Sequence, residues 1–149
     1  MVCNIDRNQI DLTKIAIKAL QRTIINTAAN FAQKEQREFI MKGIFDAMEI
    51  DDDTIQTDAI EALADVPEVA YEHISDQVTT IGQWTQKYLQ AQNYAHVREI
   101  FEFWINLAIF EGKAEKLNKS RGYFSTYEND LLGLVYQGMT MTEFDESDT

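Results

Sequence analysis

The stretch IQTDAIEAL, residues 55–63, places Ile55, Ala59, Ile60 and Leu63 at three- and four-residue spacing. Side chains at this spacing lie on one side of an α-helix, so the stretch predicts a helix with a single apolar face. The aspartates just before it, residues 51–53, suit a helix N-terminus through capping and the helix dipole.

The same spacing returns at fixed distances on both sides of this stretch. Matching residues lie 43 positions earlier and 41 positions later, namely Leu12, Ala16, Ile17 and Leu20, then His96, Ile100, Phe101 and Trp104. The intervening helices keep the second spacing, since Ile40 pairs with Ile81 and Met48 with Leu89. A two-helix unit of about 40–47 residues is the HEAT and armadillo period. The sequence therefore predicts an all-α superhelix, a HEAT- or armadillo-like solenoid, with a compact helical bundle as the alternative.

The predicted solenoid covers residues 1–142 as about three partial-to-complete hairpins, with an acidic tail at 143–149. Its helices are expected at 11–32, 36–48, 53–72, 77–91, 94–111 and 124–139. The first of these is expected to bury one apolar stripe, consisting of Leu12, Ile15, Ala16, Ala19, Leu20 and Ile24. Pro67 lacks a backbone donor, so we expect a kink or break there. A polar stretch at 113–123 separates the last two helices.

The predicted array begins and ends in mid-repeat, and neither end carries a polar capping helix. A solenoid needs such caps because each hairpin buries its apolar face only against its neighbours. We therefore expect a piece of a longer array, with apolar surface at both ends and a tendency to self-associate.

Composition limits the possible functions. The chain has 149 residues, 45% of them hydrophobic, and a net charge of −12. This charge disfavours nucleic acid and anionic membrane surfaces and favours basic partners. Cys3 is the only cysteine and no apolar run approaches a membrane span, so a reducing, intracellular compartment is expected.

No residue pattern points to catalysis or metal binding. His73 and His96 do not belong to a metal-binding motif, and His96 shares the core register, which favours a packing role. The aspartates at 51–53 do not form an EF-hand loop, because its sixth position would be Gln56 and not glycine. We predict neither catalytic residues nor a cofactor nor a metal, and an acidic helical enzyme or metal-binding bundle is the least favoured class.

Two groups of side chains lie off the predicted core. Phe39 stands at the edge of the apolar stripe of its helix, where it either lines a groove between hairpins or packs between repeats. Carboxylates off the stripes of 53–72 and 94–111 are Asp58, Glu61, Asp65, Glu99 and Glu102. They suit a basic partner through long-range electrostatic attraction.

Several segments resemble the N-terminal half of importin-β, a nuclear transport receptor of the karyopherin family. Residues 14–41 look like a middle HEAT repeat, and Glu102-Phe103-Trp104 resembles a run in the following B helix. Residues 112–123 fall where that family has a longer loop, and 137–148 resemble the approach to its acidic loop. The acidic residues Asp145 and Glu146 lie in this last segment, whose aspartate run is shorter than the family's.

The resemblance implies protein import into the nucleus by a receptor that moves between cytoplasm, nuclear pore and nucleus. Phe39, Ile40 and Gln36 match a groove for phenylalanine-glycine (FG) repeats of nucleoporins, although the family often carries an acidic residue at Gln36. The basic partner would be importin-α or a basic cargo bound by the acidic residues, with release by the Ran GTPase, whose surface is incomplete here. A generic HEAT scaffold, such as a phosphatase scaffold subunit or another karyopherin, is the alternative.

Overall fold

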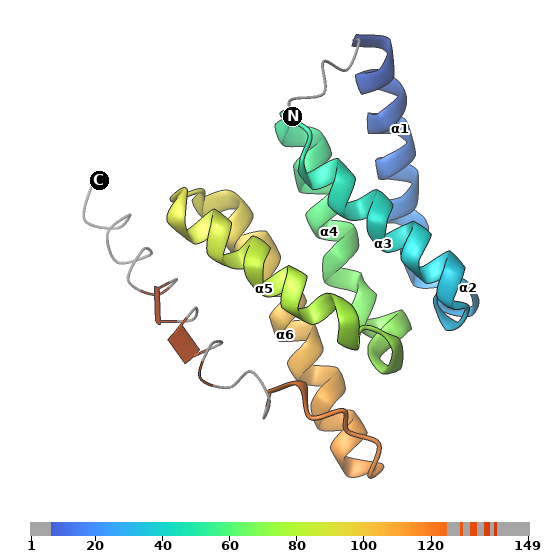
Figure 1. Cartoon of the computed structure of the whole chain (residues 1–149), viewed down its shortest axis with the longest axis vertical. Coiled ribbons are helices and arrows are strands. Elements are labelled where there is room, and N and C mark those ends of the chain that lie inside the picture. Colours follow the sequence, from blue (N-terminus) through green and yellow to red (C-terminus); the bar gives the residue numbers. More distant parts are fainter. Residues whose placement is uncertain (1–6, 125–128, 130–131, 134–135, 138, 140–149) are drawn as a thin grey trace.

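The structure is a computed structural model, and it describes residues 7–124 together with residues 129, 132–133, 136–137 and 139. Most of these residues are helical and none of them lies in a strand, which confirms the all-α prediction. The elements up to residue 116 run in the order α1 (Arg7–Thr23), η1 (Ile24–Asn26), α2 (Ala28–Ala32), α3 (Lys34–Met48), α4 (Asp53–Ala70), η2 (Tyr71–His73), α5 (Ser75–Gln90) and α6 (Tyr94–Lys116) (Figure 1).

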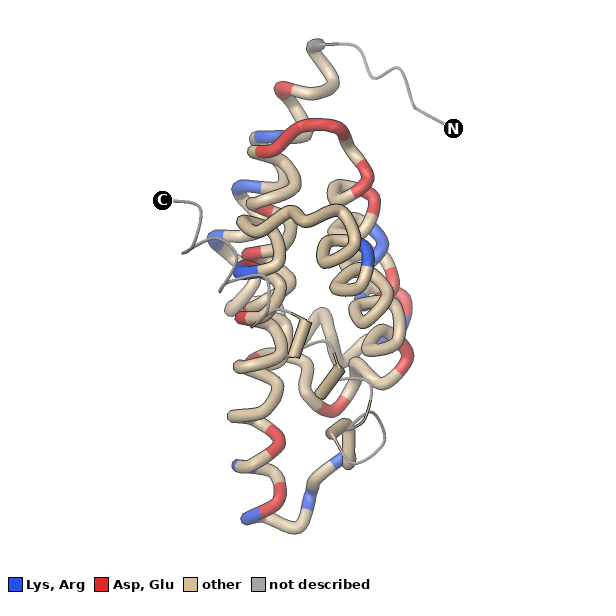
Figure 2. The backbone as a smooth tube through the Cα atoms, turned by 90° about the vertical axis from the view of Figure 1, so that its left-hand side faces the viewer, with Lys and Arg blue, Asp and Glu red and all other residues tan. Residues whose placement is uncertain are grey.

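The helices form two layers, which Figure 2 shows edge-on. In one layer, α4 packs between α1 and α6; in the other lie α3 and α5, each joined by a short turn to its partner, α4 or α6. The core fills the space between the layers. Its largest fully buried side chains are Phe31, Phe103, Ile24, Met41, Ile44, Met48, Ile55, Ile60, Leu63, Ile74, Ile81 and Ile100.

Helix ends follow local sequence signals. The carboxylate of Asp52 accepts a hydrogen bond from the Ile55 N–H at 3.0 Å, which confirms the capping role expected of the 51–53 aspartates. This bond and the Lys14 ammonium at 3.2 Å hold the pKa of Asp52 below its usual value, against the opposing effect of desolvation. Asn93 caps α6 in the same way through the His96 N–H. Gln92, at a φ of 54°, turns the chain between α5 and α6.

The predicted helix at 11–32 is wrong in its middle, because it divides into α1, η1 and α2. Thr27 causes the division: its hydroxyl and its N–H both bond to the Ile24 carbonyl. Such a local side-chain bond competes with helix continuation. The break lets Ile24 and Phe31 both enter the core.

The apolar stripe expected on the first helix is also wrong in part. Ile24 is buried and Leu20 packs against the core as expected, but Leu12 and Ile15 are 67% and 69% exposed. Ile17, which the 43-residue spacing matched to Ile60, is buried instead. The helix carries two apolar rows, and only the row that faces α3 and α4 has neighbours to cover it.

Pro67 does not break α4, which continues to Ala70. A helical proline removes the bond to the carbonyl four residues earlier and disturbs the turn around it. The Asn106 side chain of α6 donates to the nearby Ala64 carbonyl at 2.8 Å, so a neighbouring helix supplies a donor to this turn. Tertiary packing thus tolerates the proline.

The helix predicted at 94–111 extends further, to Lys116. Ala114 is buried, and this contact outweighs the cost of about 1 kcal/mol for Gly112 within a helix. The helix ends where Asn118 adopts a φ of 55° and the Lys119 N–H bonds to the Ala114 carbonyl, a Schellman-type cap. Most of the helix predicted at 124–139 and the whole tail at 143–149 lie outside the described residues.

Candidate protein-binding surfaces

The outer surface of α3 carries an uncovered aromatic side chain. Phe39 is 81% exposed, whereas its neighbour Ile40 is half-buried against the core. Charged residues flank the phenylalanine along the helix, including Glu38, which pairs with Lys34 at 3.8 Å. An exposed ring held by a rigid helix is a suitable anchor for an apolar ligand side chain, because little conformational freedom is lost on binding.

Gln36 lies at the corner between α2 and α3. Its Oε1 accepts from Asn30 Nδ2 at 2.7 Å, and its Nε2 donates to Gln33 Oε1 at 2.5 Å. The nearby Arg37 guanidinium donates to the Phe31 carbonyl at 2.6 Å. Gln36 is therefore engaged within the corner, whereas Phe39, one helical turn away, is open to a ligand.

Asp58 was expected off the core, and the structure shows otherwise. The residue is 6% exposed and accepts a bond from Lys18 Nζ at 2.9 Å, which joins α4 to α1. A buried carboxylate needs such a partner because desolvation disfavours the charged form. Asp58 therefore stabilises the contact between α1 and α4 and is not open to a basic partner. Sequence spacing could not reveal this pair, since Lys18 is 40 positions away.

The other carboxylates of α4 remain closer to solvent. Glu61, Asp65 and Glu68 recur at four- and three-residue spacing, which places them on one side of the helix. Burial raises the pKa of Asp65, and the negative charges of Glu68 and Glu61 raise it further. Bringing a cation to this row would relieve the mutual repulsion. On α6, Glu102 is exposed, and the predicted Asp145 and Glu146 lie outside the described residues.

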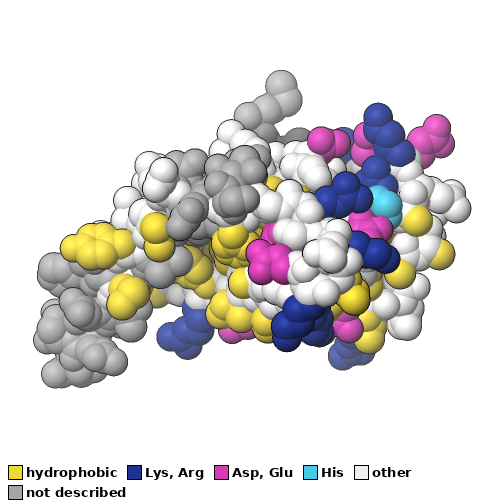
Figure 3. Space-filling model, turned by 90° about the horizontal axis from the view of Figure 1, so that it is seen from below, with side chains coloured by type: hydrophobic (Ala, Val, Ile, Leu, Met, Phe, Trp, Pro, Cys, Tyr) yellow, Lys and Arg dark blue, Asp and Glu magenta, His cyan; other side chains and the backbone are white. Residues whose placement is uncertain are grey.

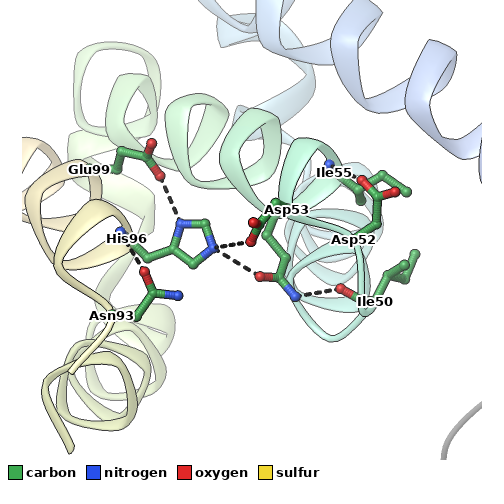
Figure 4. Close-up of polar contacts among 8 residues, drawn as sticks. Ile50, Asp52, Asp53, Ile55, Asn93, His96 and Glu99 are labelled. Atoms are coloured by element: carbon green, nitrogen blue, oxygen red, sulfur yellow. Dashed lines mark hydrogen bonds and ion pairs between the residues drawn. The ribbon is translucent and has the colours of Figure 1, made fainter. Parts of the chain in front are cut away.

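Glu99, predicted to meet a basic partner, belongs to a polar junction between α4 and α6 (Figure 4). His96 is 2% exposed, which confirms the predicted packing role. Its Nδ1 lies 3.1 Å from Glu99 Oε2, and its Nε2 lies 2.9 Å from Gln56 Oε1 and 3.7 Å from Asp53 Oδ1. Gln56 Nε2 in turn donates to the Ile50 carbonyl, which orients the amide oxygen toward the ring. The junction locks the relative position of the two helices.

A second buried carboxylate holds the segment after α6. Glu111 accepts hydrogen bonds from the Gly122 N–H at 2.9 Å, the Tyr123 N–H at 3.0 Å and the Ser120 hydroxyl. Burial alone would raise the pKa of Glu111, but these bonds and the Tyr71 hydroxyl together lower it. This role was not predictable from spacing, because the polar stretch at 113–123 carries no helical pattern that points to Glu111.

Near this segment, the ends of α4 and α6 border a shallow depression of about 320 Å³. Val69, Phe110 and Leu117 contribute apolar surface, and Glu72 and Lys113 contribute opposite charges. Figure 3 views the molecule from this end and shows apolar side chains interspersed with charged ones. The mixed character gives the depression no preference for one ligand chemistry.

Among the described residues, no helix has the length and apolarity needed to cross a bilayer. The same part of the chain contains no group of three or more His, Cys, Asp or Glu residues placed to hold a metal ion. Comparison with protein-family models finds no matching family, and neither a curated protein nor a solved structure matches the chain.

Proposed function

We propose that this chain is a protein-binding piece of a nuclear transport receptor similar to importin-β, and that it acts by binding and not by catalysis. The layer of α3 and α5 would bind FG repeats of nucleoporins. The layer of α1, α4 and α6 would bind a basic cargo or the importin-α adaptor. Binding of the Ran GTPase would regulate release. The receptor would move between cytoplasm and nucleus through the pore.

Support for a repeat arrangement comes from the packing of the hairpins. The pair α3–α4 and the pair α5–α6 lie side by side, and α1 continues the layer that contains α4 and α6. Each helix of that layer packs mainly against its immediate neighbours, as expected for a solenoid. The proposed HEAT-type superhelix extends this pattern.

The observation that carries the functional proposal is the exposure of Phe39. A phenylalanine that is 81% exposed on α3, beside the half-buried Ile40, offers an apolar contact to another aromatic side chain. FG repeats supply such a side chain in an extended segment. The acidic row on α4 supports the basic partner, because its carboxylates repel one another until a cation binds.

A generic helical-repeat scaffold is the second candidate. The observation in its favour concerns Gln36, which is occupied by Asn30 and Gln33 and therefore has less capacity to bind a peptide. A scaffold of this type would use the same exposed surfaces for other partners.

A binding titration with a fluorescent FG-repeat peptide tests the proposal. Phe39→Ala should weaken binding at least about tenfold, whereas Leu117→Ala, which removes another exposed apolar side chain just after α6, should not. A peptide with serine in place of phenylalanine should not bind. Equal binding by the wild type and Phe39→Ala would reject the groove assignment.

The acidic row on α4 needs a separate titration with a lysine-rich import-signal peptide. Glu61→Gln and Glu68→Gln together should weaken this interaction, and raising the salt concentration should weaken it further, since exposed charges are screened. Binding that is unaffected by the two substitutions and by salt would exclude electrostatic recognition at this row.

A further inference from the structure

The outward-facing side of α1 carries a row of exposed apolar side chains that no other helix up to residue 124 covers. Leu12 and Ile15 are 67% and 69% exposed, and Ala16 and Ala19 are exposed beside them. The row adjoins a shallow groove of about 540 Å³ between α1 and α4, to which Ile15, Ala19 and Arg22 contribute. The repeat register shows which kind of partner fits this row.

The equivalent row in α4, 43 residues later, is buried. Ile55, Ala59 and Ala62 have no exposed surface, and Asp58 is 6% exposed. This row faces the preceding helix of the layer, because Asp58 binds Lys18 of α1. In α6, the equivalent row contains His96 and Phe103, and it faces α4 through His96 and Gln56. The row of α1 is therefore the surface by which a helix of this layer meets the helix before it.

The opposite edge of the layer carries the complementary surface. On α6, Arg98 and Glu102 are exposed, and Ile105 and Ile109 are 51% and 49% exposed. The residue of α4 equivalent to Ile105, 41 positions earlier, is Ala64, which is buried and accepts a bond from Asn106 of α6. At the position of Ile105, a helix of this layer thus meets the helix after it, whereas the α4 equivalents of Glu102 and Ile109, which are Glu61 and Glu68, lie nearer to solvent.

We propose that two copies of this chain associate head to tail, with the α6 row of one copy docked on the α1 row of the other. In this contact α6 of one copy would pack against α1 of the other as α1 packs against α4 and α4 against α6 within one chain. The helices α1, α4 and α6 run in the same direction (Figure 1). That direction brings Arg98 toward Asp11 and Glu102 toward Arg22, all four of which are exposed, so charges of opposite sign meet beside the apolar row.

The proposed contact uses two different surfaces, so it is heterologous. Each associated pair still has one free α1 row and one free α6 row. Association therefore continues beyond the dimer as protein concentration rises, unless a ring closes. An isologous dimer, built from two α1 rows or two α6 rows, would stop at two copies.

Sedimentation velocity over a range of protein concentrations tests this proposal. The wild type should sediment as growing oligomers, whereas Ile15→Glu and Ile105→Glu should each associate at least about tenfold more weakly. Both positions are exposed, so the variants should fold with the circular dichroism of the wild type. Phe39→Glu, on the other layer, is the matched control and should associate normally.

Mixing the two variants distinguishes the geometry. Ile15→Glu keeps the α6 row and Ile105→Glu keeps the α1 row, so an equimolar mixture should form a dimer and nothing larger. A wild type that stays monomeric overturns the proposal. An association that depends on only one of the two rows, or variants that fail to complement each other, also overturns it.

Discussion

Glu111 on α6 accepts a hydrogen bond from the backbone N–H of Tyr123 at 3.0 Å, twelve residues further along the chain. The Tyr123 hydroxyl continues inward and donates to the Tyr71 carbonyl at 2.6 Å. The rings of Tyr71 and Tyr123 also meet edge to face, with centroids 5.3 Å apart. Glu111 and Tyr123 thereby attach the segment after α6 to α6 itself and to η2 at the end of α4.

Glu111→Gln should lower the free energy of unfolding by about 1–3 kcal/mol at neutral pH, because an amide cannot accept all of these bonds. The pKa of Glu111 is lowered from the ordinary value of 4.5, so the wild-type carboxylate stabilises the fold fully above that pH. This contribution is lost as the pH falls through the lowered pKa.

Urea unfolding at neutral and acidic pH measures this effect. The stability difference between the wild type and Glu111→Gln should shrink as the pH falls below 4.5. Glu115→Gln, at an exposed position on the same helix, should change little at either pH. A pH-independent difference would show that the carboxylate does not carry the effect.

The Lys18–Asp58 pair should stabilise the contact between α1 and α4. Asp58→Ala leaves a lysine without its partner and should cost about 1–3 kcal/mol, a range typical of hydrogen bonds to charged groups and desolvated partners. A double-mutant cycle with Lys18→Met isolates the coupling from the packing change. The exposed Lys42–Asp46 pair provides the comparison and should show a coupling of about 0.5 kcal/mol or less. Equal coupling for the two pairs would contradict a special role for burial.

Asp65→Asn should stabilise the protein slightly, by about 0.5 kcal/mol at neutral pH, a magnitude typical of like-charge pairs on a helix. The raised pKa of Asp65 means that its negative charge costs stability, a cost relieved as the pH falls through that raised pKa. Thermal unfolding at neutral and acidic pH measures both effects. Glu102→Gln on α6 serves as a control for simple loss of negative charge. A destabilised Asp65→Asn would mean that the carboxylate has a favourable partner.

Thr85→Val should destabilise the contact between α5 and α6. The Thr85 hydroxyl accepts from Trp104 Nε1 at 3.0 Å and donates to the Ile81 carbonyl at 2.8 Å, and the residue is fully buried. Valine keeps the volume but leaves the indole N–H unsatisfied, at a cost of about 1–3 kcal/mol. Thr85→Ser retains the hydroxyl and should cost less. Urea unfolding ranks the variants, and a valine variant as stable as the serine variant would contradict this assignment.

The helices themselves were predictable from sequence because their signals are local. Three- and four-residue spacing located α3, α4 and α5, and the aspartate cap at the start of α4 appears where residues 51–53 indicated it. The break at Ile24–Asn26 was not predicted, because it depends on a threonine side chain whose bond competes with an otherwise favourable helical pattern.

The surfaces were less predictable, because burial depends on neighbouring helices. Phe39 was placed at the edge of a stripe, and the structure leaves it exposed. Asp58 was placed off the core by the same reasoning, yet it is buried against Lys18 from a helix 40 residues away. Charge patterning along one helix contains no information about which cation a neighbouring helix presents.

The amino-acid sequence by itself determined the helical class and the approximate bounds of most helices, since both follow from spacing along the chain. Only the tertiary structure decided which of the two apolar rows of α1 is buried, which carboxylates form internal bonds, and which rows remain open at the edges of the layer. The physical reason is that an apolar row has the same helical spacing whether or not a neighbour covers it. Solvent exclusion arises only when another helix packs on that row.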